Sequence, residues 1–265
     1  MRVGHISDLH LRRNLQGTSA VPARLSRDMP ELLSAALSAM MVAGVDVVVV
    51  TGDLVDHPYP VEDTPETLRN GRADLQLVAE ALQQLSCPWA VLPGNHDHPE
   101  LFRDVFGLKP HEFDCQGIRF TAFHDWDRSL VADDDEVATN VPRRIGAERT
   151  RFEALLADDD SRPQVHLQHY VITPRLDEGW PHTYADGEYL CDAVVQDGRI
   201  RLALSGHYHP GSSCLRAGDN GMGTWFNVAP AFCEIPHPYL LHDLGSDGCL
   251  VTTRVELKPD SENLL

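Results

Sequence analysis

The sequence feature that most constrains the fold is an almost continuous run of valine at residues 45–51, which ends directly in Gly52 and Asp53. A strand without alternating polar residues is buried on both faces, as the strands of parallel sheets are. Parallel neighbours in a sheet need a crossover connection, and that connection is usually a helix. The run therefore predicts an α/β protein.

Helical and strand-like segments alternate through most of the chain. Pro30 in a first turn and Gly44 at a stop frame the first expected helix. Alternation that gives way to a late antiparallel group of strands predicts a layered α/β fold with a mixed sheet, in one domain that covers residues 1–265. The expected helices are 29–43, 67–85 and 147–157, and the expected strands are 3–7, 45–51, 88–92, 119–123, 164–168, 200–205, 225–229, 239–244 and 250–256.

Composition narrows the functions that such a fold could have. The 265 residues include 22 lysines and arginines against 40 aspartates and glutamates, for a net charge of −18. A surface this acidic repels nucleic acids and anionic membranes. We therefore expect a small-molecule substrate and no nucleic-acid partner, although bound divalent cations would reverse the charge locally. The sequence leaves the oligomeric state open, a homodimer included.

Three features predict a cytoplasmic protein without membrane insertion. The longest apolar stretch, residues 35–50, is interrupted by Gly44 and Asp46, so we expect no transmembrane helix. A polar motif begins at Asp8, directly after the first expected strand, and cleavage of a signal peptide would destroy it. The six cysteines stand singly, which is typical of reduced thiols; an exported disulfide framework is the alternative.

Five expected strands end in polar residues of the types that bind metal ions. In an open α/β sheet, sites form beyond the carboxyl ends of the strands. Glycine precedes three of the clusters, as expected where the chain turns sharply or must approach an ion. Alone, the first motif could be a turn with a capping aspartate and the second an Asx turn, but their joint placement favours one site. The motifs are Asp8-Leu9-His10, Gly52-Asp53-Leu54-Val55-Asp56, Gly94-Asn95-His96-Asp97, His169 and Gly206-His207-Tyr208-His209.

This ordered set, from residue 8 to residue 209, resembles the calcineurin-like metallophosphoesterase superfamily. The resemblance implies a four-layer α/β/β/α sandwich with two facing mixed β-sheets and a dinuclear metal centre at one edge. Asp53 would bridge the two metal ions. The resemblance assigns Asp8, His10, Asp53 and His209 to one ion, and Asp53, Asn95, His169 and His207 to the other.

The resemblance also implies roles for three neighbouring residues. His96 would be the catalytic histidine that faces the substrate, and Asp56 would orient it from behind. Asp97 would have a supporting role nearby. A general acid such as His96 is worth about 10²–10⁴-fold in rate, and a carboxylate behind it fixes the tautomer of the imidazole.

The residue types suit particular ions and a particular reaction. Carboxylate, amide and imidazole ligands favour Mn, Fe or Zn ions, and the absence of cysteine disfavours a structural zinc site. Two ions about 3.5–4 Å apart can hold both the attacking and the leaving oxygen of a phosphoester. We therefore expect a metal-dependent phosphoric ester hydrolase.

The length and motif form look most similar to the class III cyclic-nucleotide and glycerophosphodiester phosphodiesterases. The alternatives are a phosphomonoesterase or nucleotidase, a DNA-repair nuclease, and a non-catalytic scaffold of the same fold. One departure weakens the cyclic-nucleotide assignment, because Tyr170 and Val171 follow His169 where related enzymes have an HHPP-like stretch. The candidates for substrate contact are His57, His98 and His124.

Overall fold

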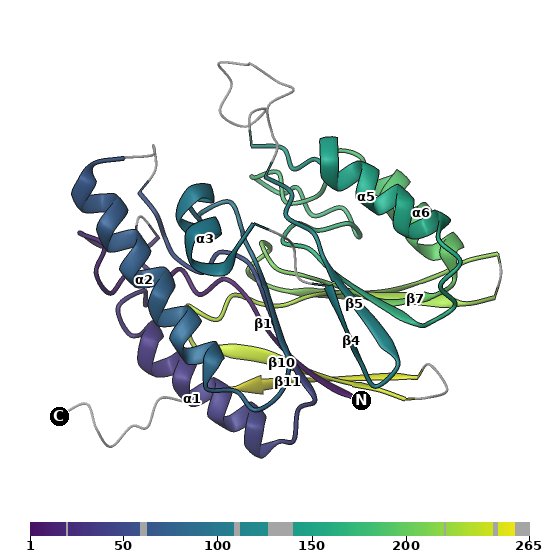
Figure 1. Cartoon of the computed structure of the whole chain (residues 1–265), viewed down its shortest axis with the longest axis horizontal. Coiled ribbons are helices and arrows are strands. Elements are labelled where there is room, and N and C mark those ends of the chain that lie inside the picture. The colour runs from purple at the N-terminus through teal and green to yellow at the C-terminus, as the bar shows by residue number, and fades with distance from the viewer. Residues whose placement is uncertain are drawn as a thin grey trace.

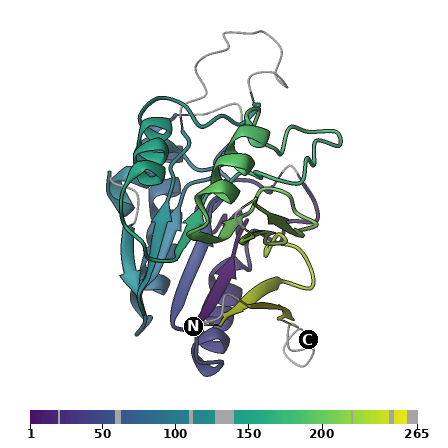
Figure 2. The ribbon, with the colours of Figure 1, turned by 90° about the vertical axis from the view of Figure 1, so that its right-hand side faces the viewer.

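The computed structural model describes residues 1–19, 21–58, 63–108, 112–126, 140–219, 221–245 and 249–257. Its two mixed sheets lie face to face (Figures 1 and 2). In the first sheet, β1, β2 and β3 are parallel, whereas β10 and β11 are antiparallel to their neighbours. Its strands are, in spatial order, β11 (Leu250–Glu256), β10 (Pro238–Leu244), β1 (Arg2–Ile6), β2 (Val47–Thr51) and β3 (Trp89–Leu92).

The second sheet has a parallel centre with an antiparallel strand at each edge. β5, β6, β7 and β9 run parallel, and β4 and β8 pair antiparallel with β5 and β9. The spatial order is β4 (Glu112–Cys115), β5 (Ile118–Ala122), β6 (Gln164–Leu167), β7 (Ile200–Ser205), β9 (Gly223–Val228) and β8 (Ser212–Ala217).

Helices cover the outer face of each sheet. α1 (Met29–Val42), α2 (Pro65–Gln83) and α3 (Pro99–Phe106) share an apolar core with the first sheet, and α5 (Gly146–Ala157) and α6 (Gly187–Asp197) share one with the second. A third core lies between the sheets, where Val47 and Val49 of β2 belong to the same cluster as Val165 of β6. Three cores between four layers confirm the expected α/β/β/α sandwich.

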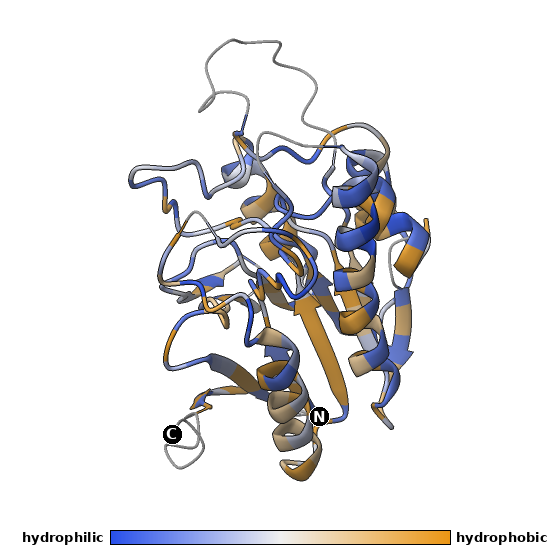
Figure 3. Cartoon of the chain, turned by 90° about the vertical axis from the view of Figure 1, so that its left-hand side faces the viewer, coloured by the Kyte–Doolittle hydropathy of each residue, from blue (hydrophilic) through white to orange (hydrophobic). Residues whose placement is uncertain are grey.

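The helices bury the faces that their sequences make apolar. In α1 the buried residues recur at helical spacing, with Leu33, Ala36 and Met40 among them. β2, by contrast, is buried at every position, as its valine run predicts. In Figure 3 a strand in the middle of the view is almost entirely apolar, whereas the helices carry both apolar and polar residues. No helix in the described parts of the chain combines the length and the apolar character that a membrane crossing requires.

The structure corrects the expected elements in two respects. α3, β4, α6 and β8 were not among them. The late strands also do not form one antiparallel group. β9 joins the second sheet parallel to β7, whereas β10 and β11 join the first. Sheet membership is decided by contacts between distant segments, and the local pattern of a strand does not encode them.

The carboxyl ends of the parallel strands meet at one edge of the sandwich, and hydrogen bonds join the two sheets there. His169, which follows β6, has its Nδ1 2.7 Å from the carbonyl oxygen of Thr51 at the end of β2. The backbone N–H groups of Phe232 and Cys233, beyond β9, donate to the carbonyls of Ser7 and Asp8 beyond β1. Segments that are far apart in sequence are therefore fixed around a common point.

Candidate metal centre

The expected ligands lie together at this edge in two groups. One group consists of Asp8, His10 and His209, and in it Asp8 Oδ1 lies 3.9 Å from His10 Nε2 and 3.8 Å from His209 Nε2. The other consists of Asp53, His169 and His207. Within each group the potential ligand atoms all lie within 4.8 Å of one another, which is close enough for one cation to touch them all.

Asp53 lies between the two groups. Its Oδ2 is 3.5 Å from His10 Nε2 on one side and 3.5 Å from His169 Nε2 on the other. The side-chain oxygen of Asn95 lies 3.1 Å from the same nitrogen of His169. The structure therefore brings together all seven residues that the sequence motifs single out, with Asp53 between the two groups.

The backbone of this site is strained. Non-glycine residues seldom adopt a positive φ, and such residues cluster at functional sites where the surrounding structure enforces the conformation. Here φ lies between 44° and 69° at four of the seven residues. They are Asp8, His10, Asp53 and His207.

The motif glycines leave room for the site side chains. A Cβ atom on Gly94 would lie 2.1 Å from Asp53 Oδ1, and one on Gly206 would lie 1.9 Å from the hydroxyl of Ser7. A Cβ on Gly52 would meet the ring of His169 at 2.4 Å. The expectation that glycine is needed for close approach therefore has a specific cause here, because any side chain would displace a group of the site.

Burial keeps two imidazoles of the site neutral. It lowers the pKa of His10 to about 3, although the charge of Asp53 opposes this, and it lowers the pKa of His207 well below its usual value. For His169, burial acts in the same direction, but the negative charge of Asp53 outweighs it and raises the pKa to about 9. Neutral imidazole is the form that binds metal ions, so the protonation state of His10 and His207 suits metal binding.

A histidine–carboxylate pair stands beside this group. Nδ1 of His96 lies 2.9 Å from Asp56 Oδ1, and the rings of His96 and His10 form a T-shaped contact. The same carboxylate oxygen of Asp56 lies 3.3 Å from the guanidinium of Arg24, and Arg12 Nε donates to the backbone carbonyl of Asp56 at 2.9 Å. Asp56 is thus held in place from several sides and can fix the orientation of His96.

Asp97 connects the two loops that carry Asp53 and Asn95. Its carboxylate accepts hydrogen bonds from the backbone N–H groups of Leu54, Val55 and Gly94, at 3.1, 3.0 and 2.8 Å. Burial, reinforced by the charge of Asp53, raises its pKa to about 7. Asp97 therefore holds the loops of the site together.

A family model for calcineurin-like phosphoesterases matches residues 1–211 of the chain. The chain belongs to this family. It is a metal-dependent phosphoester hydrolase, and the resemblance carried by the five strand-end motifs is confirmed.

Curated relatives of this phosphoesterase include two bacterial proteins. A probable cyclic nucleotide phosphodiesterase of a Synechococcus species is 22% identical over 214 residues, which cover 79% of this chain and 73% of the relative. A component of the nuclease SbcCD of Staphylococcus saprophyticus is 34% identical over 131 residues, which cover 49% of this chain and 31% of the relative.

Solved structures share the fold at low sequence identity. A dimetal phosphatase from Danio rerio is 17% identical, with a TM-score of 0.71 over 97% of this chain and 96% of that one. A purple acid phosphatase from yellow lupin is 14% identical, with a TM-score of 0.62 over 97% of this chain and 51% of that one. At these identities the likeness shows the fold of the phosphoesterase alone.

The residues fit the dinuclear metal site that the family implies. Neither ring nitrogen of His10 has a hydrogen-bond partner among the described residues, although the side chain is fully buried. An unsatisfied buried polar atom is costly, and a cation beside Nε2 would satisfy it. The donor set of carboxylates, an amide oxygen and imidazoles, without cysteine, is the one that suits Mn, Fe or Zn ions.

A cavity of about 470 Å³ opens over the metal centre of the phosphoesterase. Asp53, Asn95 and His96 are among the residues that line it. Tyr208 lines the cavity together with Trp180 and His182 of the segment after His169. The lining residues outside the predicted site are Arg24, Glu178, Trp180, His182, Tyr208 and Pro210.

Sequence reasoning did not identify three residues that support the site. Glu234, which follows β9, lies 2.7 Å from Nδ1 of His209 and so fixes the orientation of that ring. Arg24 and Arg12 hold Asp56. Glu234 follows a strand as the other motifs do, but neither of its two sequence neighbours is a glycine or a histidine that would have drawn attention to it.

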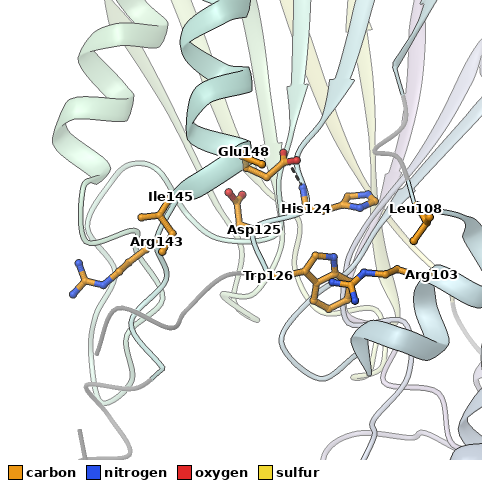
Figure 4. Close-up of a pocket in the computed structure, with 9 residues that line it drawn as sticks. Arg103, Leu108, His124, Asp125, Trp126, Arg143, Ile145 and Glu148 are labelled. Carbon is orange, nitrogen blue, oxygen red and sulfur yellow. Dashed lines mark hydrogen bonds between the residues drawn. The ribbon is translucent and has the colours of Figure 1, made fainter. Parts of the chain in front are cut away.

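The three candidates for substrate contact lie apart from this cavity. His124 lines a neighbouring hollow with Asp125 and Trp126, and its backbone N–H donates to Glu148 (Figure 4). His57 and His98 contact each other, with ring centroids 4.9 Å apart, and both are buried. The structure therefore groups His57 with His98 and places His124 elsewhere.

Proposed function

We propose that this phosphoesterase hydrolyses phosphodiesters of small molecules, such as cyclic nucleotides or glycerophosphodiesters, with two metal ions. Asp8, His10 and His209 would hold one ion with the shared Asp53. The second ion would have the ligands Asn95, His169 and His207, again with Asp53. The observation that carries this proposal is the pair of ligand groups on either side of one aspartate.

The two ions, when bound, supply positive charge for the phosphoryl oxygens and lower the pKa of a water molecule to near neutrality. The residues of the chain provide orientation and proton transfer. Asp56 accepts the Nδ1–H of His96, so that Nε2 is directed away from it and toward the cavity. From there His96 can donate a hydrogen bond to a phosphoryl oxygen or a proton to the leaving group.

Two properties of the molecule favour a small substrate. The cavity of about 470 Å³ has the size of an ordinary small-molecule site. The net charge of −18 is unfavourable for binding a nucleic-acid backbone. The Synechococcus relative supports a cyclic nucleotide, whereas the nuclease relative supports DNA but has only 31% of its length in common with this chain.

We further propose a cytoplasmic location and Mn, Fe or Zn as the ions. The ligand set does not include thiolate, so hard and borderline ions are favoured. Cys87, Cys115, Cys191, Cys214 and Cys233 form no disulfide within the described part of the chain, which is compatible with a reducing compartment.

The test is a substrate panel with Mn²⁺ supplied to metal-stripped protein. We expect bis-p-nitrophenyl phosphate to be cleaved faster than p-nitrophenyl phosphate, and a cyclic nucleotide or glycerophosphodiester to be cleaved faster than single-stranded DNA. Preference for the monoester would assign a phosphomonoesterase, and preference for DNA a nuclease. Asp53→Ala is the negative control, because it removes the shared ligand; full turnover with a full metal complement in that variant would refute the ligand assignment.

A further inference from the structure

A second cluster of potential metal ligands lies outside the dinuclear centre. Nε2 of His98 is 3.2 Å from Asp63 Oδ1, and Nε2 of His57 is 3.8 Å from the same oxygen. One ligand atom from each residue lies within 4.8 Å of the other two. His57 and Asp63 belong to the connection between β2 and α2, and His98 is the N-cap of α3. The fold brings His98 to the other two residues and so completes the cluster.

The ring of His57 is buried, and the described residues offer it no hydrogen bond. Its side chain is 3% exposed, and neither ring nitrogen has a hydrogen-bond partner among the described residues. The ring packs closely against α2, because a Cβ on Gly71 would lie 3.1 Å from Cδ1 of Leu101 and 3.2 Å from Nδ1 of His57. Glycine within a helix lowers the stability of that helix, so the close approach of the ring is obtained at the expense of helix stability. Buried polar atoms normally have a hydrogen-bond partner, and a bound cation can take the place of one. The ring nitrogens of His57 are therefore suited to bind a metal ion.

We propose that His57, Asp63 and His98 form a third metal site, which binds one borderline divalent cation such as Zn²⁺. Two imidazoles and one carboxylate are a common zinc ligand set, and tetrahedral geometry leaves the fourth position to water. Asp63, whose side chain is 54% exposed, provides the entry from solvent, while the two histidines are buried behind it. This proposal does not depend on the proposed function or on the choice of substrate.

One existing contact competes with this ion. Nδ1 of His98 accepts a hydrogen bond from the backbone N–H of Leu101 as the N-cap of α3, at a long distance of 3.4 Å. When Nε2 of His98 binds a cation, the ring hydrogen must be on Nδ1, and this cap is lost. A hydrogen bond of that length is weak, whereas a coordination bond to zinc is strong. The ion is therefore favoured over the cap.

The third site would fasten two loops of the catalytic centre to each other. His57 follows Asp56 directly, and its backbone N–H donates to the carbonyl oxygen of His96 at 3.2 Å. His98 lies two residues beyond His96. A cation shared by the two imidazoles would thus restrain the loops that carry Asp56 and His96, without itself touching the reacting atoms. This role differs from the substrate contact that we expected for His57 and His98.

The experiment measures zinc per chain by equilibrium dialysis followed by elemental analysis. The variants are His98→Asn, which keeps a residue type suited to an N-cap, and Asp63→Asn, which removes only the charge. Asp159→Asn is the matched control, since Asp159 lies outside all the ligand groups. We expect the wild type and the control to bind one zinc ion more than either variant, and circular dichroism verifies that each variant is folded.

The expected difference of one zinc ion between the wild type and each variant does not depend on how many ions the dinuclear centre holds. In an Asp53→Ala background the third site should still bind one zinc ion, and adding Asp63→Asn should remove it. Cobalt provides a second readout, because the visible absorption of Co²⁺ in the wild type should lose the contribution of one site in Asp63→Asn. Equal zinc content and equal cobalt spectra in the wild type and both variants would overturn the proposal.

Discussion

At the scale of single residues, the metal centre is built from conformations and approaches that would be unfavourable elsewhere. A left-handed backbone costs an ordinary residue about 1–2 kcal/mol, and four residues of the centre adopt it, namely Asp8, His10, Asp53 and His207. Such strain persists only where the fold enforces it. Here each strained residue directs a polar side chain to the same point. The strain lowers the local stability of the backbone, and the arrangement of the polar side chains depends on it.

His96 provides the first prediction. His96→Asn should lower kcat by about 10²–10⁴-fold while the metal content remains that of the wild type, because the ring can transfer a proton but is not among the proposed ligands. Asp56→Asn should have a smaller effect in the same direction, since it weakens only the orientation of the ring. Steady-state kinetics and elemental analysis of the same samples check both, and a parallel loss of metal in His96→Asn would make His96 a ligand.

Gly94 provides the second prediction. In Gly94→Ala the new methyl group would lie 2.1 Å from Asp53 Oδ1, so the shared carboxylate must move. We expect metal content and turnover to fall together. Gly17→Ala is the control, because its methyl group meets nothing within 4 Å. The φ of 74° at Gly17 is unfavourable for alanine, so we expect this variant to lose stability but not metal. Retention of both metal ions by Gly94→Ala would show that the loop adapts and that the glycine has another purpose.

At the scale of helices and strands, the ends of the elements carry the chemistry. α2 begins at Pro65 after Thr64, whose side chain accepts the backbone N–H of Thr67 at 3.1 Å. This cap fixes the start of the helix next to Asp63, so the start of α2 determines the geometry of the proposed third site. The residue at which a helix begins thus affects the geometry of a site outside that helix.

Thr64 provides the third prediction. Thr64→Ala removes the cap and should lower the free energy of unfolding by about 1 kcal/mol. Thr64→Ser retains the hydroxyl and should be close to the wild type. Urea denaturation monitored by circular dichroism measures both variants. If alanine and serine had equal effects, the contribution of Thr64 would come from its methyl group and not from the hydrogen bond.

The elements that the sequence predicts well are those whose pattern is local. The valine run of β2 and the motifs at the strand ends follow from neighbouring residues, and the structure gathers all seven motif residues that we proposed as ligands. α3 was missed because it is only eight residues long and follows the Gly94 motif directly, so few residues carry its helical pattern. Glu234 was missed because its partner, His209, lies 25 residues away, and only the fold brings the two together.

At the scale of the whole molecule, the proposed ligands come from both sheets. Asp8 and Asp53 follow strands of the first sheet, whereas His169 and His207 follow strands of the second. The centre therefore exists only while the sandwich is intact. Conditions that separate the sheets or open either of them should remove the metal site even if the helices persist, so the stability of the sandwich matters for function.

A buried histidine pair makes the stability of the first sheet depend on pH. His242 of β10 and His5 of β1 are fully buried, with 3.2 Å between His242 Nε2 and His5 Nδ1, and His242 Nδ1 lies 2.9 Å from the hydroxyl of Thr252 in β11. Burial lowers the pKa of His242 to about 3, against about 6.5 in an unfolded chain. The unfolded state therefore binds a proton that the folded state excludes.

The sign of the pH effect follows from this difference and provides the fourth prediction. The contribution of His242 to stability is complete above pH 6.5 and is lost as the pH falls toward 3. In that interval the free energy of unfolding of the wild type should fall by up to about 1.4 kcal/mol per pH unit more steeply than that of His242→Gln. Urea titrations of metal-stripped protein at several pH values measure the slopes, and metal removal keeps ligand protonation at the catalytic centre from contributing through ion release. Parallel slopes for the two proteins would mean that His242 is already charged in the folded sheet, and its place between β1 and β11 would then need a counter-charge.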